Sequence, residues 1–201
     1  MLRPGVLLAL LLPVAGCGVT DYGADRANLA DGGAAGAHTL AWAAGQLMTE
    51  AREDLMPAAR LAWAGCYLPD TGSEVDLSDC FAAFNEPSRT DGFAFCTGAD
   101  GTCVIDDDDP GPYLATYWVE DWYIDSDLAL ERLSDLELSA VAVEPAYATN
   151  GLQMVLSAYP SFDMPPGTPD NRAAVLAVDC CAIVQAVMDG VTGDFWSPTT
   201  E

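Results

Sequence analysis

Lysine is absent from this chain of 201 residues, and its basic side chains are seven arginines and a single histidine. Against them stand 31 aspartates and glutamates, so the formal net charge at pH 7 is −24. A field of this sign repels phosphate groups, which argues against nucleic acid as a partner. The missing lysine fits either a GC-rich genome that avoids its codons or a surface adapted to salt.

Catalytic and cofactor motifs are missing as well. The sequence has no Gly-x-Ser-x-Gly elbow, no His-Glu-x-x-His zinc motif and no glycine-rich loop for a phosphate. Its one histidine, His38, is expected to be exposed to solvent. Carboxylate pairs for glycoside hydrolysis carry no information in a chain with 31 acids. We therefore interpret the chain as non-enzymatic and keep a hydrolase as the least favoured alternative.

The apolar run near the N-terminus, residues 6–14, is too short to cross a bilayer, which needs about 20 residues. Arg3 precedes this run, and Val14-Ala15-Gly16-Cys17 closes it. The pattern resembles the lipobox of bacterial lipoproteins, which ends a removable export signal. The resemblance implies cleavage before Cys17, lipid on its sulfur and a membrane as the partner of that lipid.

The same resemblance divides the chain into three parts. Residues 1–16 are expected to be the signal peptide, residues 17–36 the lipidated cysteine with a flexible tether, and residues 37–201 a single domain. Lipoproteins kept at the inner membrane commonly carry aspartate after the cysteine, whereas this chain has Gly18. This implies a cell-envelope protein at the outer membrane or the cell surface.

The pattern of apolar residues predicts an α+β domain, with an N-terminal helix and a small antiparallel sheet stapled by disulfides. The alanine-rich segment 37–60 favours a helix that Pro57 ends or kinks. Loop-rich segments with four cysteines follow. They contain three apolar islands, at residues 61–68, 80–84 and 93–96.

The second half of the chain alternates strands and a helix in this prediction. Residues 113–124 favour a strand and residues 127–136 a short helix, and residues 137–143 and 152–159 favour a hairpin. Residues 171–190 are either one helix or a strand to Asp179 followed by a helix from Cys180.

Six cysteines remain beside Cys17, and an even number in an exported chain is typical of disulfides. Turn-rich sequences separate Cys66 from Cys80 and Cys96 from Cys103, which favours these two pairs. The neighbours Cys180 and Cys181 leave an alternative open, in which each of them bonds to Cys66 or Cys80.

Two features are candidate binding sites. The acidic run 106–109 offers Asp106, Asp108 and Asp109 as ligands for Ca²⁺, although position 117, where an EF-hand needs glutamate, is tyrosine. A solvated acidic loop is the preferred interpretation of this run. The aromatic residues of segment 113–123 are either core residues or a platform for sugars or apolar ligands.

We expect a lipid-anchored protein with a structural or interaction role toward an unknown protein. The alternative is a binding module for an apolar or lipid ligand. A pocket for that ligand would be lined by Leu152, Val155, Leu176 and Ile183.

Overall fold

The computed structural model describes residues 28–31, 35–68, 74–89, 92–106, 118–135, 152–158, 173–178 and 184–196. Several predictions fall outside these ranges and stay predictions. They concern the lipobox with Cys17, the calcium candidates Asp108 and Asp109, the strand at 137–143, and the adjacent Cys180 and Cys181.

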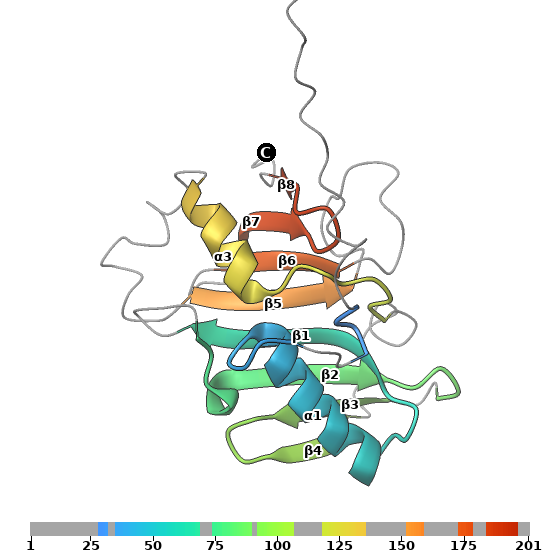
Figure 1. Cartoon of the computed structure of the whole chain (residues 1–201). Helices are drawn as coiled ribbons and strands as arrows, with labels where there is room; N and C mark the ends of the chain where they lie inside the picture. Colours follow the sequence, from blue (N-terminus) through green and yellow to red (C-terminus); the bar gives the residue numbers. More distant parts are fainter. Residues whose placement is uncertain are drawn as a thin grey trace, which may run out of the picture.

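An eight-stranded antiparallel sheet forms the domain, in the order β4-β3-β2-β1-β5-β6-β7-β8 (Figure 1). Helices α1 and α3 cover the same face of it, α1 over β1–β4 and α3 over β5–β7. This confirms the α+β class with an N-terminal helix and an antiparallel sheet. The strands are β1 (Arg60–Leu68), β2 (Cys80–Asn85), β3 (Phe93–Thr97), β4 (Thr102–Asp106), β5 (Leu152–Ala158), β6 (Ala173–Val178), β7 (Val184–Asp189) and β8 (Phe195–Trp196).

Helix α1 (Leu40–Asp54) is shorter at both ends than the predicted segment 37–60. It begins after Thr39, whose hydroxyl accepts a hydrogen bond from the amide of Trp42 and so caps the first turn. It ends three residues before Pro57, and Arg60 already belongs to β1. The chain therefore turns from helix to strand within five residues, 55–59.

The apolar islands of the predicted loop region are strands β1, β2 and β3, so the loop assignment was wrong there. A short 3-10 helix, η2 (Leu77–Asp79), precedes β2. β1 carries a bulge between Leu61 and Trp63, which places two consecutive residues, Ala62 and Trp63, opposite one residue of β2.

The prediction for residues 152–159 was right about the strand and wrong about its partner. β5 pairs with β1 on one side and with β6 on the other. A strand has only two hydrogen-bonding edges, so segment 137–143 has no edge of β5 to occupy.

Segment 171–190 forms two strands, β6 and β7, paired as a hairpin. A strand up to Asp179 was one of the two predicted alternatives, and β6 agrees with it. The predicted helix from Cys180 is wrong, because Val184–Asp189 is strand β7. Pairing with β5 and β8 outweighs the helix propensity of the alanines.

The second helix is confirmed, and the strand before it is not. α3 spans Ser126–Asp135, close to the predicted 127–136. The described part of the predicted strand, 118–124, is extended chain with a single bridge at Asp121. We call residues 118–125 the crossing segment, because it joins the sheet through backbone hydrogen bonds at several strands.

The crossing segment is held at both of its ends. The amide of Val119 donates to Leu61 O at 2.7 Å, and those of Tyr123 and Ile124 donate to Gly190 O at 2.8 and 2.9 Å. A Cβ at Gly190 would lie 2.8 Å from the carbonyl oxygen of Ala173, so this close approach requires glycine.

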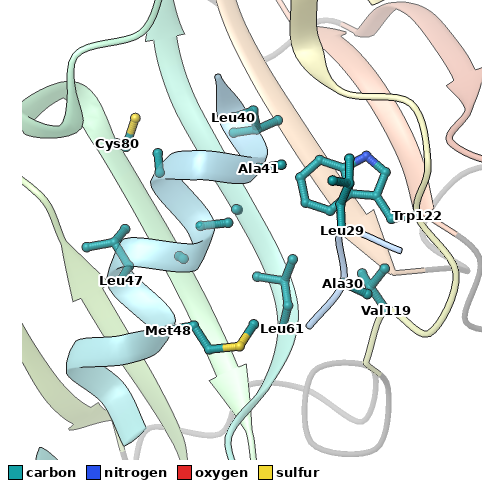
Figure 2. Packing of buried hydrophobic residues seen from close by; sticks show 14 of the residues in the cluster. Leu29, Ala30, Leu40, Ala41, Leu47, Met48, Leu61, Cys80, Val119 and Trp122 are labelled. Atoms are coloured by element: carbon teal, nitrogen blue, oxygen red, sulfur yellow. The ribbon is translucent and has the colours of Figure 1, made fainter. Parts of the chain in front are cut away.

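The main core lies between α1, the sheet and the crossing segment, and a smaller buried cluster of Ala62, Ala83 and Phe93 lies on the opposite face of the sheet. Figure 2 shows Met48 of α1 beside Leu61 of β1, and Leu29 beside the ring of Trp122. Leu29 and Ala30 are 8% and 4% exposed, and the amide of Leu29 donates to Trp122 O. The core therefore begins before the predicted domain boundary at 37, and residues 28–31 are not part of a flexible tether.

Candidate functional site: an aromatic patch on the sheet

Strands β1–β4 have two faces with different side chains. The face under α1, the helix face, carries mainly small and aliphatic residues and the buried ring of Phe84. The opposite face, the far face, carries five aromatic rings and a valine. Phe93 of β3 is buried there beside Ala62 and Ala83, and the other four rings with the valine form the group that we call the aromatic patch. Its members are Trp63 and Tyr67 of β1, Phe81 of β2, Phe95 of β3 and Val104 of β4.

The four rings are in contact with one another. Phe81 lies opposite Gly65, the residue between Trp63 and Tyr67 on this face. Its ring centroid is 5.3 Å from Trp63 and 5.9 Å from Tyr67, both edge to face. Phe95 completes the group at 6.0 Å from Trp63 and 6.5 Å from Phe81. Since Gly65 has no side chain, the Phe81 ring fills the space that it leaves.

The patch is open to solvent at one end and on one side. Tyr67 is 48% and Val104 55% exposed, and they are the large apolar residues that the described part of the chain leaves exposed. Trp63, Phe81 and Phe95 are half-buried. Cross-strand aromatic pairs stabilise a sheet, but that role does not require exposed apolar atoms beside them. Tyr67 of β1 and Val104 of β4 lie at opposite edges of the patch, with the three half-buried rings between them.

The charges around β1–β4 are unevenly distributed. One end of these strands, the acidic end, contains the start of β2 and the β3–β4 turn, and Tyr67 lies near it. Its exposed acids are Glu74, Asp76, Asp79 and Asp100. Of the four arginines in the described ranges, three lie toward the opposite end: Arg60 starts β1, Arg89 lies in the β2–β3 turn, and Arg52 donates to Ala59 O. Glu86 and Asp106 lie at that end as well.

Local hydrogen bonds hold two of these acids in the ionised form. The backbone amide and then the hydroxyl of Ser78 lower the pKa of Asp76. The hydroxyls of Thr97 and Thr102 lower the pKa of Asp100, whose Oδ1 they approach at 2.6 and 2.7 Å. The acidic end therefore stays negative at neutral pH.

The predicted aromatic platform in segment 113–123 is not where the exposed rings are. Trp122 is fully buried and donates from Nε1 to Ile124 O at 2.7 Å, so it is a core residue. Trp118 is half-buried, with the guanidinium of Arg60 at 5.0 Å from its ring centroid. Tyr113 and Tyr117 lie outside the described residues.

The sequence contained a signal for the true patch. Trp63, Gly65 and Tyr67 alternate with Ala64 and Cys66, and Phe93 and Phe95 alternate with Ala94. This period of two is typical of a strand with two different faces. It was missed because apolar residues occupy both faces, which hides the alternation.

The two disulfides form as the turn sequences predicted. Cys66 bonds to Cys80 and Cys96 to Cys103, each across a pair of directly opposite residues in adjacent strands. The alternative in which Cys66 and Cys80 bond to Cys180 and Cys181 is wrong. Both bonds lie on the helix face, so they tie together the strands that carry the patch on their other face.

A buried carboxylate holds the start of α1. Asp125 is 5% exposed, and its Oδ1 accepts the amides of Ala41 at 3.0 Å and Ser126 at 2.7 Å. Its Oδ2 has no hydrogen-bond partner among the residues that the structure describes. Burial raises the pKa of Asp125, while the Thr39 hydroxyl and the two amides act in the opposite direction.

The other candidates do not form a site within the described ranges. His38 is exposed, as expected, with its ring 5.1 Å from that of Trp42. Asp106 ends β4 opposite Phe93. No group of three His, Cys, Asp or Glu side chains among the described residues is placed to hold a metal ion, and calcium at Asp108 and Asp109 stays a prediction.

The predicted apolar pocket also stays a prediction. Val155 and Leu176 are directly opposite each other on β5 and β6, and Leu152 begins β5. Ile183 lies outside the described residues.

No family model, no curated protein and no solved structure shows significant similarity to this chain. Among the described residues, no helix has the length and apolar character needed to cross a bilayer.

Proposed function

We propose that this chain is a bacterial lipoprotein of the cell envelope, anchored by lipid on Cys17, whose folded domain has a structural or interaction role and no catalytic activity. The observation that carries the proposal is the export signal that ends in Val14-Ala15-Gly16-Cys17. The exposed rings of the aromatic patch support a role in contact with another molecule.

The tether is shorter than the boundary at residue 37 implied. Core packing begins at Leu29, so only residues 18–27 separate the lipidated cysteine from the first described residue, Asn28. A chain of this length reaches at most about 38 Å when fully extended. The domain is therefore held close to the bilayer and needs no surface of its own for the membrane.

Substitution of the cysteine tests the anchor. We expect Cys17→Ser to move the protein from the membrane fraction to the soluble fraction of the expressing bacterium. Gly18→Ala is the matched control and keeps it in the membrane. Mass spectrometry of the mature protein from membranes is expected to show lipid on Cys17. An unmodified N-terminus, or a Cys17→Ser protein that stays in the membrane, contradicts the proposal.

The location within the envelope has its own test. In a bacterium with two membranes, Gly18→Asp is expected to move the lipidated protein from the outer to the inner membrane, since aspartate after the cysteine is the common retention signal. Fractionation of the two membranes by density measures this shift. Wild-type protein in the inner membrane contradicts the outer-membrane or cell-surface assignment.

A further inference from the structure

Among the features outside the anchor, the aromatic patch combines exposed apolar rings with a strongly negative rim. Tyr67 and Val104 are exposed, and four exposed carboxylates lie in the segments that join the strands at the end nearer Tyr67. Arg52, Arg60 and Arg89 lie toward the other end of these strands, together with Glu86 and Asp106. The surface thus offers apolar contact on the far face and attraction for positive charge at one end of the strands.

The patch lies away from the point at which the chain enters the domain. Asn28 enters the domain at the crossing segment, where its side chain bonds to Glu120 O, and the neighbouring Val119 bonds to Leu61 near the start of β1. Leu29 packs into the core on the helix face. Tyr67 lies six residues farther along β1, about 20 Å away, and on the far face. The chain therefore enters the domain at the other end of β1 from Tyr67 and on the other face of the sheet.

Charge argues against a second copy of this chain. Each chain carries a formal charge of −24, and apposed patches would bring two sets of Glu74, Asp76, Asp79 and Asp100 together. Like charges facing each other across an interface oppose association. A partner with positive charge next to an apolar side chain gains from both components of the surface.

We infer that the aromatic patch docks a protein segment that presents arginine or lysine side chains beside an apolar anchor. Arginine stacks on aromatic faces and pairs with carboxylates, and this chain already shows such a contact between Arg60 and Trp118. The apolar anchor of the partner covers Tyr67 and Val104, and its basic side chains reach the acidic end. The inference deepens the interaction role proposed above.

Synthetic peptides test this chemistry on the full-length lipidated protein in detergent. One peptide alternates arginine and leucine, a second alternates glutamate and leucine, and a third alternates arginine and serine. We expect the arginine–leucine peptide to bind at least about tenfold more tightly than either of the others. We also expect its binding to weaken as salt is added, because the attraction is screened. Equal binding of the three peptides, or no binding, overturns the inference.

Substitutions locate the binding on the patch. Tyr67→Ser is expected to weaken binding of the arginine–leucine peptide about tenfold, whereas Tyr67→Phe keeps the ring and the affinity. The pair Glu74→Gln with Asp79→Asn is expected to weaken it about threefold. The pair Glu50→Gln with Asp54→Asn, on exposed positions of α1, removes the same charge and is expected to leave the affinity unchanged. Similar effects from both pairs overturn the assignment of the acidic end.

Two further outcomes identify a different occupant. Binding of the Cys17→Ser chain to vesicles of phosphatidylcholine, lost in Tyr67→Ser, assigns the patch to a lipid surface and overturns the inference. A dimer in sedimentation that Tyr67→Ser dissociates assigns it to a second copy. Failure of the lipid-anchor proposal can be distinguished from failure of this inference, because the Cys17→Ser chain carries no lipid and its peptide binding can still be measured.

Discussion

The two faces of strands β1–β4 are built from the same alternating chain, yet they contain opposite kinds of side chain. The helix face is made mostly of small buried residues, such as Ala64, Ala82 and Ala94, together with the two disulfides and the ring of Phe84. The far face has the large aromatic rings, partly in water. The small residues of the helix face let α1 approach closely. Phe93 is buried on the far face beside Ala62 and Ala83, so part of that face is core as well. The exposed atoms of Tyr67 and Val104 are what the far face offers to another molecule.

The same substitution on both faces of one strand gives the largest expected contrast. Phe84 is fully buried on the helix face of β2, and Phe81 is half-buried on the far face of the same strand. We expect Phe84→Ala to lower the free energy of unfolding by about 4 kcal/mol, from lost burial and the cavity left. Phe81→Ala is expected to cost about 1 kcal/mol, from the lost ring contacts. Urea unfolding measures both, and equal losses would show that the far face is as much a part of the core as the helix face.

The disulfides provide the next contrast, within the helix face. The Cys66–Cys80 bond joins residues 14 apart, and the Cys96–Cys103 bond joins residues 7 apart. In the chain-entropy model, the double substitution of Cys66 and Cys80 by alanine lowers the free energy of unfolding by about 3 kcal/mol. The same change at Cys96 and Cys103 is expected to cost somewhat less. The wild-type protein under reducing conditions is the control for both, and a larger loss at Cys96–Cys103 would argue against loop entropy as the cause.

Substitution of Asp125 tests which contacts hold α1 on its face of the sheet. Because burial raises its pKa in the folded protein above the ordinary value of 3.8, the folded state keeps a proton that the unfolded state releases. Its contribution to stability is therefore full below pH 3.8 and is lost as the pH rises through the folded pKa. Above that pKa, the wild type is expected to be less stable relative to Asp125→Asn than it is in acid.

Urea unfolding of both proteins across this pH range measures the difference. Asp127→Asn is the control, because this neighbouring carboxylate is exposed and raises the pKa of Asp125 only weakly. A difference between wild type and Asp125→Asn that does not change with pH would show that Asp125 titrates alike in the folded and unfolded states. Asp125→Ala removes the acceptor as well and is expected to cost about 1 kcal/mol at every pH.

Local chemistry explains which parts of the fold could be predicted. Thr39 caps the start of α1, and Pro57, which has no amide hydrogen, follows its end. The glycines between Cys96 and Cys103 form the turn that brings these cysteines together. In each case, residues close in sequence determine the structure. The two disulfide pairs and both helices were therefore predictable.

The predictions that failed concern residues whose structural partners lie far away in the sequence. The alanines of β6 favour a helix, and only pairing with β5 and β7 makes them a strand. Trp122 looks like a platform residue until the crossing segment places it in the core. The anchoring of α1 by Asp125 joins residues 84 positions apart. The aromatic patch likewise exists only because three strands align their rings on one face.

The smallest expected effect on stability is the most informative about the far face. Tyr67 is 48% exposed at the end of the patch, so Tyr67→Ser removes little buried area. We expect it to change the free energy of unfolding by no more than about 0.5 kcal/mol, while it weakens binding of the arginine–leucine peptide. Phe84→Ala is expected to show the reverse, with a large loss of stability and unchanged affinity in the molecules that remain folded. Urea unfolding and peptide titration of the same two variants measure whether stability and contact are separated between the faces. If Tyr67→Ser lowers stability as much as binding, the rings of the far face serve the sheet itself and not a partner.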